Sequence, residues 1–125
     1  MINYVREKGF YMWAVELQGT GEVIGLLNQC NNPDRFFRTM ELGYAIGKPH
    51  WGKGYTTEAL KAVCDFLFSQ GIPKICCKCI KENKASARVM EKAGFSYEGL
   101  SVKEIYYHDR YWDLLTYYRL NPLSD

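Results

Sequence analysis

Residues 40–59 decide the fold, because their sequence, MELGYAIGKPHWGKGYTTEA, contains a strand, a tight turn and the start of a helix. The apolar and β-forming residues at 40–46 predict the strand. Beyond the turn we expect a helix that is capped by Thr56 or Thr57 and runs to about Gln70. Its apolar residues recur at helical spacing, at Leu60, Val63, Cys64 and Leu67.

The turn between strand and helix has the chemistry of an anion site. Gly52 and Gly54 let the backbone bend tightly and approach a ligand closely. The helix that follows presents unpaired N–H groups and the positive end of its dipole, which suits a pyrophosphate. The two glycines alone are equally compatible with a tight connection that binds nothing. Residues 47–53 also fit GxxxxGK, but glycine follows where a nucleotide triphosphatase needs Ser or Thr for magnesium, so we disfavour that class.

The remaining chain supplies hairpins on both sides of this unit. We expect strands at residues 12–17, 22–30, 38–46, 74–80, 95–102 and 111–120. A second helix begins at a cap, Asn83, and ends at Gly94, with an inner face of Ala85, Val89, Met90 and Ala93. The expected order is β-β-β-α-β-α-β-β. Its central β-α-β crossover requires one parallel pair in a mixed, mostly antiparallel α/β sheet, and ligands favour the carboxyl ends of such strands.

Composition restricts the class of protein. A chain of 125 residues is one domain, 1–125, and 47% apolar with 24% charged residues is typical of a globular protein. The net charge of +2 is too small for a nucleic-acid footprint. The small charge leads us to expect no nucleic-acid partner. No apolar stretch approaches the length of a membrane span, and the N-terminus does not resemble a secretory signal. We therefore expect no membrane partner and a cytoplasmic location.

Five cysteines, an odd number, argue against a closed disulfide framework. Cys76, Cys77 and Cys79 cluster on one expected strand, but no CxxC or nearby His completes a tetrahedral set. We therefore interpret them as buried thiols and expect no metal.

Two linked segments resemble the GNAT superfamily of N-acetyltransferases, in the form of its RimJ/RimL-type branch. ELGYAI followed by WGKGYTTEA is similar to motif A, and NxxSxRVMEKAGF, from Asn83 to Phe95, is similar to motif B. The resemblance extends from about Trp13 to Leu120 and includes Asp109. Asn83 and Ser86, taken alone, are a helix cap and a first-turn residue.

The resemblance implies an acetyl-CoA cosubstrate. The backbone around Leu42, Tyr44 and Ile46 would lie along the pantetheine arm, and Asn83 and Ser86 would face the thioester. The loop and helix start would hold the pyrophosphate, through Trp51, Gly52, Lys53, Gly54, Tyr55, Thr56 and Thr57. Trp51 stands where many members carry Gln or Arg, and Thr56 where Gly or Ala is commoner.

The same resemblance suggests direct attack by the amine, which needs no acylated residue. Glu41, beside the expected thioester, is the candidate for accepting the amine proton; a solvated strand carboxylate is the alternative. Many members protonate the thiolate with a Tyr that is here Met90, so Ser86 is the nearest candidate donor. A tyrosine from the C-terminal hairpin is the other option, namely Tyr106, Tyr107 or Tyr111.

Relatives of this branch usually begin with another strand and two helices, and residues 1–11 look like the tail of that region. The apolar surface left without those helices should be covered by a second chain, which predicts a homodimer, with strand exchange as one way to form it. The leading hypothesis is an N-acetyltransferase acting on a small-molecule amine or a protein N-terminal α-amine. The alternative is a non-catalytic coenzyme A-binding module that acts as an oligomeric partner.

Overall fold

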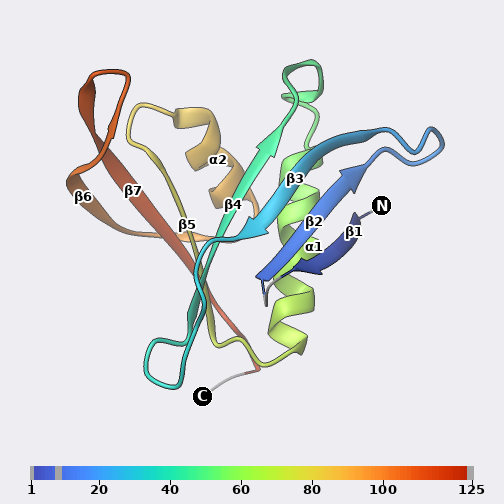
Figure 1. Cartoon of the computed structure of the whole chain (residues 1–125), viewed down its shortest axis with the longest axis horizontal. Coiled ribbons are helices and arrows are strands. Elements are labelled where there is room, and N and C mark those ends of the chain that lie inside the picture. The colour runs from blue at the N-terminus through green and yellow to red at the C-terminus, as the bar shows by residue number, and fades with distance from the viewer. Residues whose placement is uncertain (1, 8–9, 124–125) are drawn as a thin grey trace.

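Seven strands form one twisted sheet in the computed structural model, which describes residues 2–7 and 10–123 (Figure 1). The order across the sheet is β1-β2-β3-β4-β5-β7-β6. The strands are β1 (Ile2–Glu7), β2 (Phe10–Glu16), β3 (Val23–Gln29), β4 (Thr39–Ile46), β5 (Lys74–Ile80), β6 (Ser96–Tyr107) and β7 (Arg110–Leu120). Only β4 and β5 pair in parallel among these strands, so the mixed, mostly antiparallel architecture predicted from the sequence is confirmed.

Two helices make the crossovers. α1 (Tyr55–Ser69) connects β4 to β5, and α2 (Lys84–Lys92) connects β5 to β6; the helices contact each other and pack on the central strands. A short 3₁₀ turn, η1 (Lys48–His50), lies between β4 and α1. Both helices end as predicted, because Gly71 and Gly94 follow them with φ of 92° and 91°, a left-handed conformation that favours glycine.

The core lies between the helices and one face of the sheet. Its fully buried side chains alternate along β4 and β5 and recur at helical spacing on α1; the largest are Leu27, Leu42, Leu60, Leu67, Ile75 and Met90. Burying a leucine or isoleucine side chain contributes about 1.5–3 kcal/mol. Cys64, Cys76, Cys77 and Cys79 are buried free thiols, as expected, whereas Cys30 is exposed.

Several local expectations need correction. The N-terminal segment contributes an additional strand, β1, which pairs with β2; the sequence analysis treated it only as the tail of a missing region. α1 begins at Tyr55 with Gly54 as its N-cap, so the predicted cap at Thr56 or Thr57 was wrong. Gly54 has a φ of 81°, a conformation that favours glycine, so the helix begins two residues earlier than a Thr56 cap would place it.

The inner face of α2 also differs from the prediction. Met90 and Ala93 are buried as expected, but Ala85 is exposed, Val89 is half-buried, and Ala87 takes the buried place. Ala85 and Val89 line an open cleft, described below, instead of packing in the core.

Gly43, in the middle of β4, allows two neighbouring side chains to approach the backbone closely. The register between β3 and β4 runs through Gly43 without a shift. A Cβ placed there would lie 3.0 Å from Oδ1 of Asn28 and 3.2 Å from Sγ of Cys30, so glycine leaves room for these two side chains.

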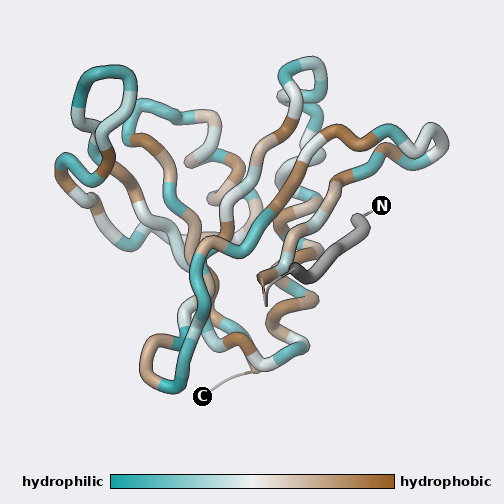
Figure 2. Tube along the Cα trace, in the orientation of Figure 1, coloured by the Kyte–Doolittle hydropathy of each residue, from teal (hydrophilic) through white to brown (hydrophobic). Residues whose placement is uncertain are grey.

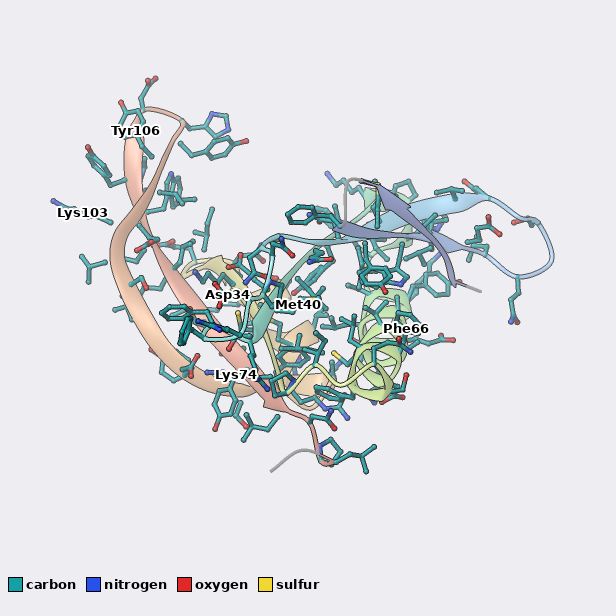
Figure 3. The ribbon with its side chains drawn as sticks, turned by 60° about the horizontal axis from the view of Figure 1, so that its bottom comes forward. Asp34, Met40, Phe66, Lys74, Lys103 and Tyr106 are labelled. Atoms are coloured by element: carbon teal, nitrogen blue, oxygen red, sulfur yellow. The ribbon has the colours of Figure 1, made fainter. Side chains whose placement is uncertain are left out.

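The C-terminal hairpin is longer than predicted. β6 extends to Tyr107 and β7 begins at Arg110, so the turn consists of His108 and Asp109, which have φ of 50° and 61°. Two positive φ angles match the right-handed twist of a two-residue hairpin. Figure 3 shows this ribbon curling away from the helices, with Tyr106 near its far end.

Candidate active site

The two parallel strands separate at their carboxyl ends. β4 pairs with β5 only from Thr39 to Leu42, although it stays paired with β3 as far as Ile46. β5 meanwhile remains paired with β7 up to Ile80. Beyond Leu42 the β5-facing edge of β4 therefore has no strand partner among the described residues. Unpaired strand edges are binding sites for extended ligands.

A cleft of about 340 Å³ opens where the strands separate. Its lining combines the end of β4, the loop before α1 and the first turns of α2: Tyr44, Ala45, Ile46, Trp51, Gly52, Thr56, Asn83, Ala85, Ser86 and Val89. Seven of these ten are residues that the sequence analysis assigned to the cofactor site. The structure thus brings together motif segments about 30 to 40 residues apart in the chain.

The cleft continues into a second cavity of about 210 Å³ over the start of α1. Both share Gly52, Thr56, Ala85 and Val89 as lining residues. The second cavity adds Gly54, Tyr55 and Thr57 from the start of α1, and three residues with basic side chains, His50, Arg88 and Lys92. The loop between β4 and α1, which borders this cavity, is mostly hydrophilic in Figure 2.

The loop geometry suits an anion. Gly52 and Gly54 have φ of 74° and 81°, and a Cβ on either would meet nothing within 4 Å, so open space lies beside both. No side chain caps the N-terminus of α1. Its first N–H groups and the positive end of its dipole are therefore available to a negatively charged ligand.

Trp51 braces the rim of the cleft. Its side chain is 63% exposed, and its Nε1–H donates a hydrogen bond to the carbonyl oxygen of Ile46 at 2.6 Å. This contact uses the last carbonyl of β4 and holds the indole ring beside the opening.

Tyr44 and Ser86 meet across the inner end of the cleft. Oη of Tyr44 lies 2.6 Å from Oγ of Ser86 and 3.1 Å from the Ser86 carbonyl oxygen. Asn83 caps α2 as predicted, because its Oδ1 accepts from the Ser86 N–H at 3.1 Å. Burial raises the pKa of the Tyr44 hydroxyl well above its usual value, so Tyr44 is protonated at neutral pH.

The sequence analysis selected Tyr44 for its backbone and missed its hydroxyl. Alternation along β4 places Tyr44 on the same face as the buried Leu42, toward the helices, and this pattern was readable in the sequence. The partner, 42 residues away, was not.

Comparison with protein families identifies the family of the chain that carries this cleft. The family described as "Acetyltransferase (GNAT) domain" matches residues 1–96. The chain belongs to the GNAT acetyltransferase family. Residues 97–123, which lie beyond that match, form most of the β6–β7 hairpin that completes the sheet.

Individual relatives agree with this assignment. The chain is 33% identical over 102 residues to the [ribosomal protein uS5]-alanine N-acetyltransferase of Escherichia coli, covering 79% of this chain and 52% of the relative. Two curated relatives from Bacillus subtilis, YkkB and the N-acetyltransferase YoaA, are matched over 57% and 66% of their length. This chain therefore spans between about half and two thirds of these relatives.

Two solved structures share the fold. The ribosomal L7/L12 α-N-protein acetyltransferase RimL, in complex with coenzyme A, has a TM-score of 0.81 and 25% identity, over 89% of this chain and 62% of that one. A variant of spermidine N-acetyltransferase from Vibrio cholerae has a TM-score of 0.82 and 26% identity, over 92% and 68%.

Glu41 of this GNAT domain lies outside the cleft lining. Its Oε1 is 3.4 Å from Nζ of Lys78 on β5, with about a third of each side chain exposed. Strand alternation from the buried Met40 and Leu42 places Glu41 on the sheet face opposite the helices. Burial and the Glu41 charge together raise the pKa of the nearby Cys30 thiol.

The other predicted site residues are dispersed. The Leu42 side chain is in the core, 2% exposed, so only its backbone can face a ligand. Lys53 is exposed and lines neither cavity. The tyrosines of the hairpin that were considered as proton donors, Tyr106, Tyr107 and Tyr111, do not line the cleft either.

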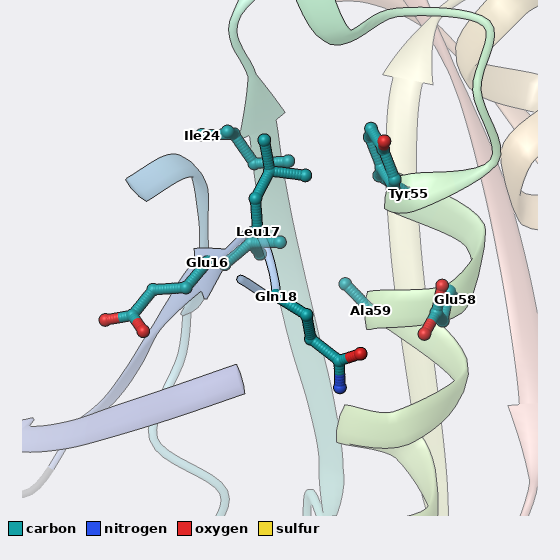
Figure 4. Close-up of a pocket in the computed structure, with 8 residues that line it drawn as sticks. Glu16, Leu17, Gln18, Ile24, Tyr55, Glu58 and Ala59 are labelled. Carbon is teal, nitrogen blue, oxygen red and sulfur yellow. The ribbon is translucent and has the colours of Figure 1, made fainter. Parts of the chain in front are cut away.

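A further cavity, of about 230 Å³, lies on the other side of the start of α1 (Figure 4). It is formed by β2, β3 and the first turns of α1, and among the predicted site residues only Tyr55 lines it. Within the part of the chain that the structure describes, no cluster of His, Cys, Asp or Glu is arranged for a metal ion. Likewise, neither described helix has the length and apolar character that a membrane crossing requires.

Proposed function

We propose that the chain is an N-acetyltransferase that moves the acetyl group of acetyl-CoA onto a primary amine by direct attack. The observation that carries the proposal is the separation of β4 from β5 beside the helix start. It joins an unpaired strand edge, a cleft and a basic anion cavity into one groove, and an extended thioester with a diphosphate has that shape and charge. The family membership supports the same cosubstrate.

In this proposal the chain's own residues bind and orient the cosubstrate. The amides of residues 52–56, with Arg88 and Lys92 nearby, hold the diphosphate. The edge of β4 beyond Leu42 pairs with the pantetheine arm, and Tyr44 and Ser86 surround the thioester. Bound this way, acetyl-CoA supplies an activated acyl group. Positioning then provides much of the acceleration.

The proton that the amine loses balances the proton that the thiolate gains. The amine nitrogen bonds to the carbonyl carbon, the C–S bond breaks, and its electron pair stays on sulfur. Glu41 accepts the nitrogen proton through water, because its side chain does not line the cleft and is not in direct contact with the thioester site. The Ser86 hydroxyl donates a hydrogen bond to the sulfur.

The acceptor is a protein N-terminal α-amine or a small-molecule amine. The names of the matched relatives include both kinds, ribosomal proteins and spermidine. A homodimer is part of the proposal. The strand β6 forms one edge of the sheet and exposes Tyr97, Leu100 and Val102, which a second copy could cover. Sedimentation at micromolar concentration should give the mass of two chains, and a monodisperse monomer contradicts this part.

One observation favours the alternative, a coenzyme A-binding module without turnover. Met90, at the position where many GNAT members carry the tyrosine acid, is fully buried and has no proton to donate.

Two assays test the proposal and separate it from the alternative. Calorimetric titration should show binding of coenzyme A and acetyl-CoA and no binding of ATP at the same concentration. A free-thiol assay with a panel of amines should show acetyl-CoA-dependent thiol release. Binding without thiol release above background supports the module, and loss of both results contradicts the coenzyme A site itself.

A further inference from the structure

We infer that Tyr44 is a positioning residue that directs the Ser86 hydroxyl proton toward the sulfur of the departing thiolate. This role rests on the proposed acetyl transfer and adds a residue to it. The evidence is the contact between two hydroxyls at the inner end of the cleft, whose oxygens are 2.6 Å apart.

The contact can exist in two hydrogen-bonding arrangements. In one, Tyr44 donates to the Ser86 carbonyl oxygen at 3.1 Å, and Ser86 donates to Oη of Tyr44. In the other, Tyr44 donates to Oγ of Ser86, which leaves the Ser86 proton free to point into the cleft. A negative sulfur in the cleft favours the second arrangement, because only that one offers it a donor.

The chain of donors also makes Ser86 a better donor. A hydroxyl that accepts a hydrogen bond polarises its own O–H bond, so Tyr44 → Ser86 → sulfur is stronger than Ser86 → sulfur alone. A lone serine is a poor acid, and this contact supplies what it lacks. Met90 cannot contribute, because it has no proton to give and is fully buried.

Tyr44 donates a hydrogen bond rather than a proton. Its pKa is raised by burial, so the hydroxyl stays protonated at neutral and mildly basic pH. The proton that the thiolate gains is balanced by the proton that the acceptor amine loses to Glu41 or water, and Tyr44 ends the cycle unchanged.

The surroundings hold the pair in place. The Tyr44 ring is half-buried on the helix-facing side of β4, and Ser86 is fixed in the first turn of α2 by the Asn83 cap. Cys79 lies against the same hydroxyl: burial raises the pKa of its thiol, and a contact with Ser86 acts in the opposite direction. The Ser86 oxygen therefore has defined neighbours on the protein side and an open side toward the cleft.

A double-mutant cycle tests the inference. Tyr44→Phe keeps the ring and removes one oxygen, so coenzyme A affinity should change less than about twofold while kcat falls by about three- to tenfold. Ser86→Ala should lower kcat further, and adding Tyr44→Phe to it should change nothing beyond about twofold, because Tyr44 acts through Ser86. Tyr118→Phe, which removes a hydroxyl on β7 outside the lining of the cleft and its neighbouring cavity, is the matched control and should leave kcat unchanged.

The pH dependence of kcat tests whether Tyr44 donates a hydrogen bond or the proton itself, whereas the double-mutant cycle separates a role through Ser86 from a packing defect. The kcat profiles of the wild type and Tyr44→Phe should run parallel between about pH 7 and 10, separated by a constant factor, since burial raises the pKa of Tyr44 above that range. Additive losses in the cycle, an unchanged kcat in Tyr44→Phe, or a basic limb present only in the wild type would each overturn the role. A wild type that binds coenzyme A but releases no thiol contradicts the proposed function as well, so the two failures are distinguishable.

Discussion

Replacing Gly54 by aspartate should sharply weaken coenzyme A binding while leaving the fold intact. Gly54 is the N-cap of α1 and has a φ of 81°. Asp and Asn tolerate this left-handed conformation better than other side chains, and both are favourable N-caps. A Cβ at this position meets nothing within 4 Å, so no clash is added to the folded protein.

The magnitude follows from charge. A carboxylate about 5 Å from the diphosphate, at an effective dielectric constant of about 40 for this exposed loop, is repelled by ~1.7 kcal/mol for each of two negative charges. The sum of about 3 kcal/mol corresponds to a loss of affinity of roughly 10²-fold. Raising the salt concentration should shrink the loss, because exposed charges are screened.

The matched control is Gly54→Asn, which has the same shape and backbone preference but no charge. Calorimetric titration with coenzyme A measures both affinities, and thermal melting shows that both variants fold. The Asn variant should lose less than about tenfold. Equal affinities for the two variants would refute the placement of the diphosphate beside Gly54, because then the charge itself has no effect.

Three further outcomes are expected. Glu41→Gln should lower kcat at neutral pH by about 10²-fold with unchanged coenzyme A affinity. Lys78→Gln, which removes only the ion-pair partner of Glu41, should have a smaller effect on kcat. Equal losses of kcat in the two variants would contradict a base role for Glu41. Asn121→Ala should lower the free energy of unfolding, measured in urea, by about 2 kcal/mol. The reason is that Nδ2 of this buried residue donates to the carbonyl oxygens of Phe68 and Ile72, each at 3.0 Å. An unchanged urea midpoint would show that water replaces both hydrogen bonds. A thiol reagent at pH 8 should label exposed Cys30 in the native protein well before the buried thiols, because burial raises the pKa of Cys64 to about 12 and that of Cys76 to about 11; mass spectrometry that finds early labelling of the buried pair would contradict this.

Much of the fold was readable because local signals agreed. Alternating and β-forming residues predicted the strands β2 to β4, a continuous apolar run predicted β5, and apolar residues at helical spacing predicted α1. The Asn83 cap and the glycines after both helices marked the helix ends. Each of these signals depends on neighbours within about one helical turn, which a sequence displays directly.

What could not be predicted depends on distant partners. β1 was missed because residues 1–11 were interpreted as the tail of a missing region; residues 2–7 form a strand on the edge that β2 offers them. Val89 fits an apolar stripe equally well whether it faces the core or a cleft, and only the separation of β4 from β5 decides between them. The Tyr44–Ser86 contact similarly requires both crossovers to be in place.

The gap between β4 and β5 is maintained by contacts on both of its walls rather than left by weak pairing. An unpaired strand edge normally recruits another strand or closes on its neighbour. Here Trp51 occupies the last carbonyl of β4, and Tyr44 ties the same strand to the start of α2 instead of to β5. β5 is held on its far side by seven residue pairs with β7, so it cannot follow β4 outward. Between Leu42 and the Ile46 carbonyl the edge therefore stays open, so an extended ligand can pair with this part of β4 without first displacing another strand.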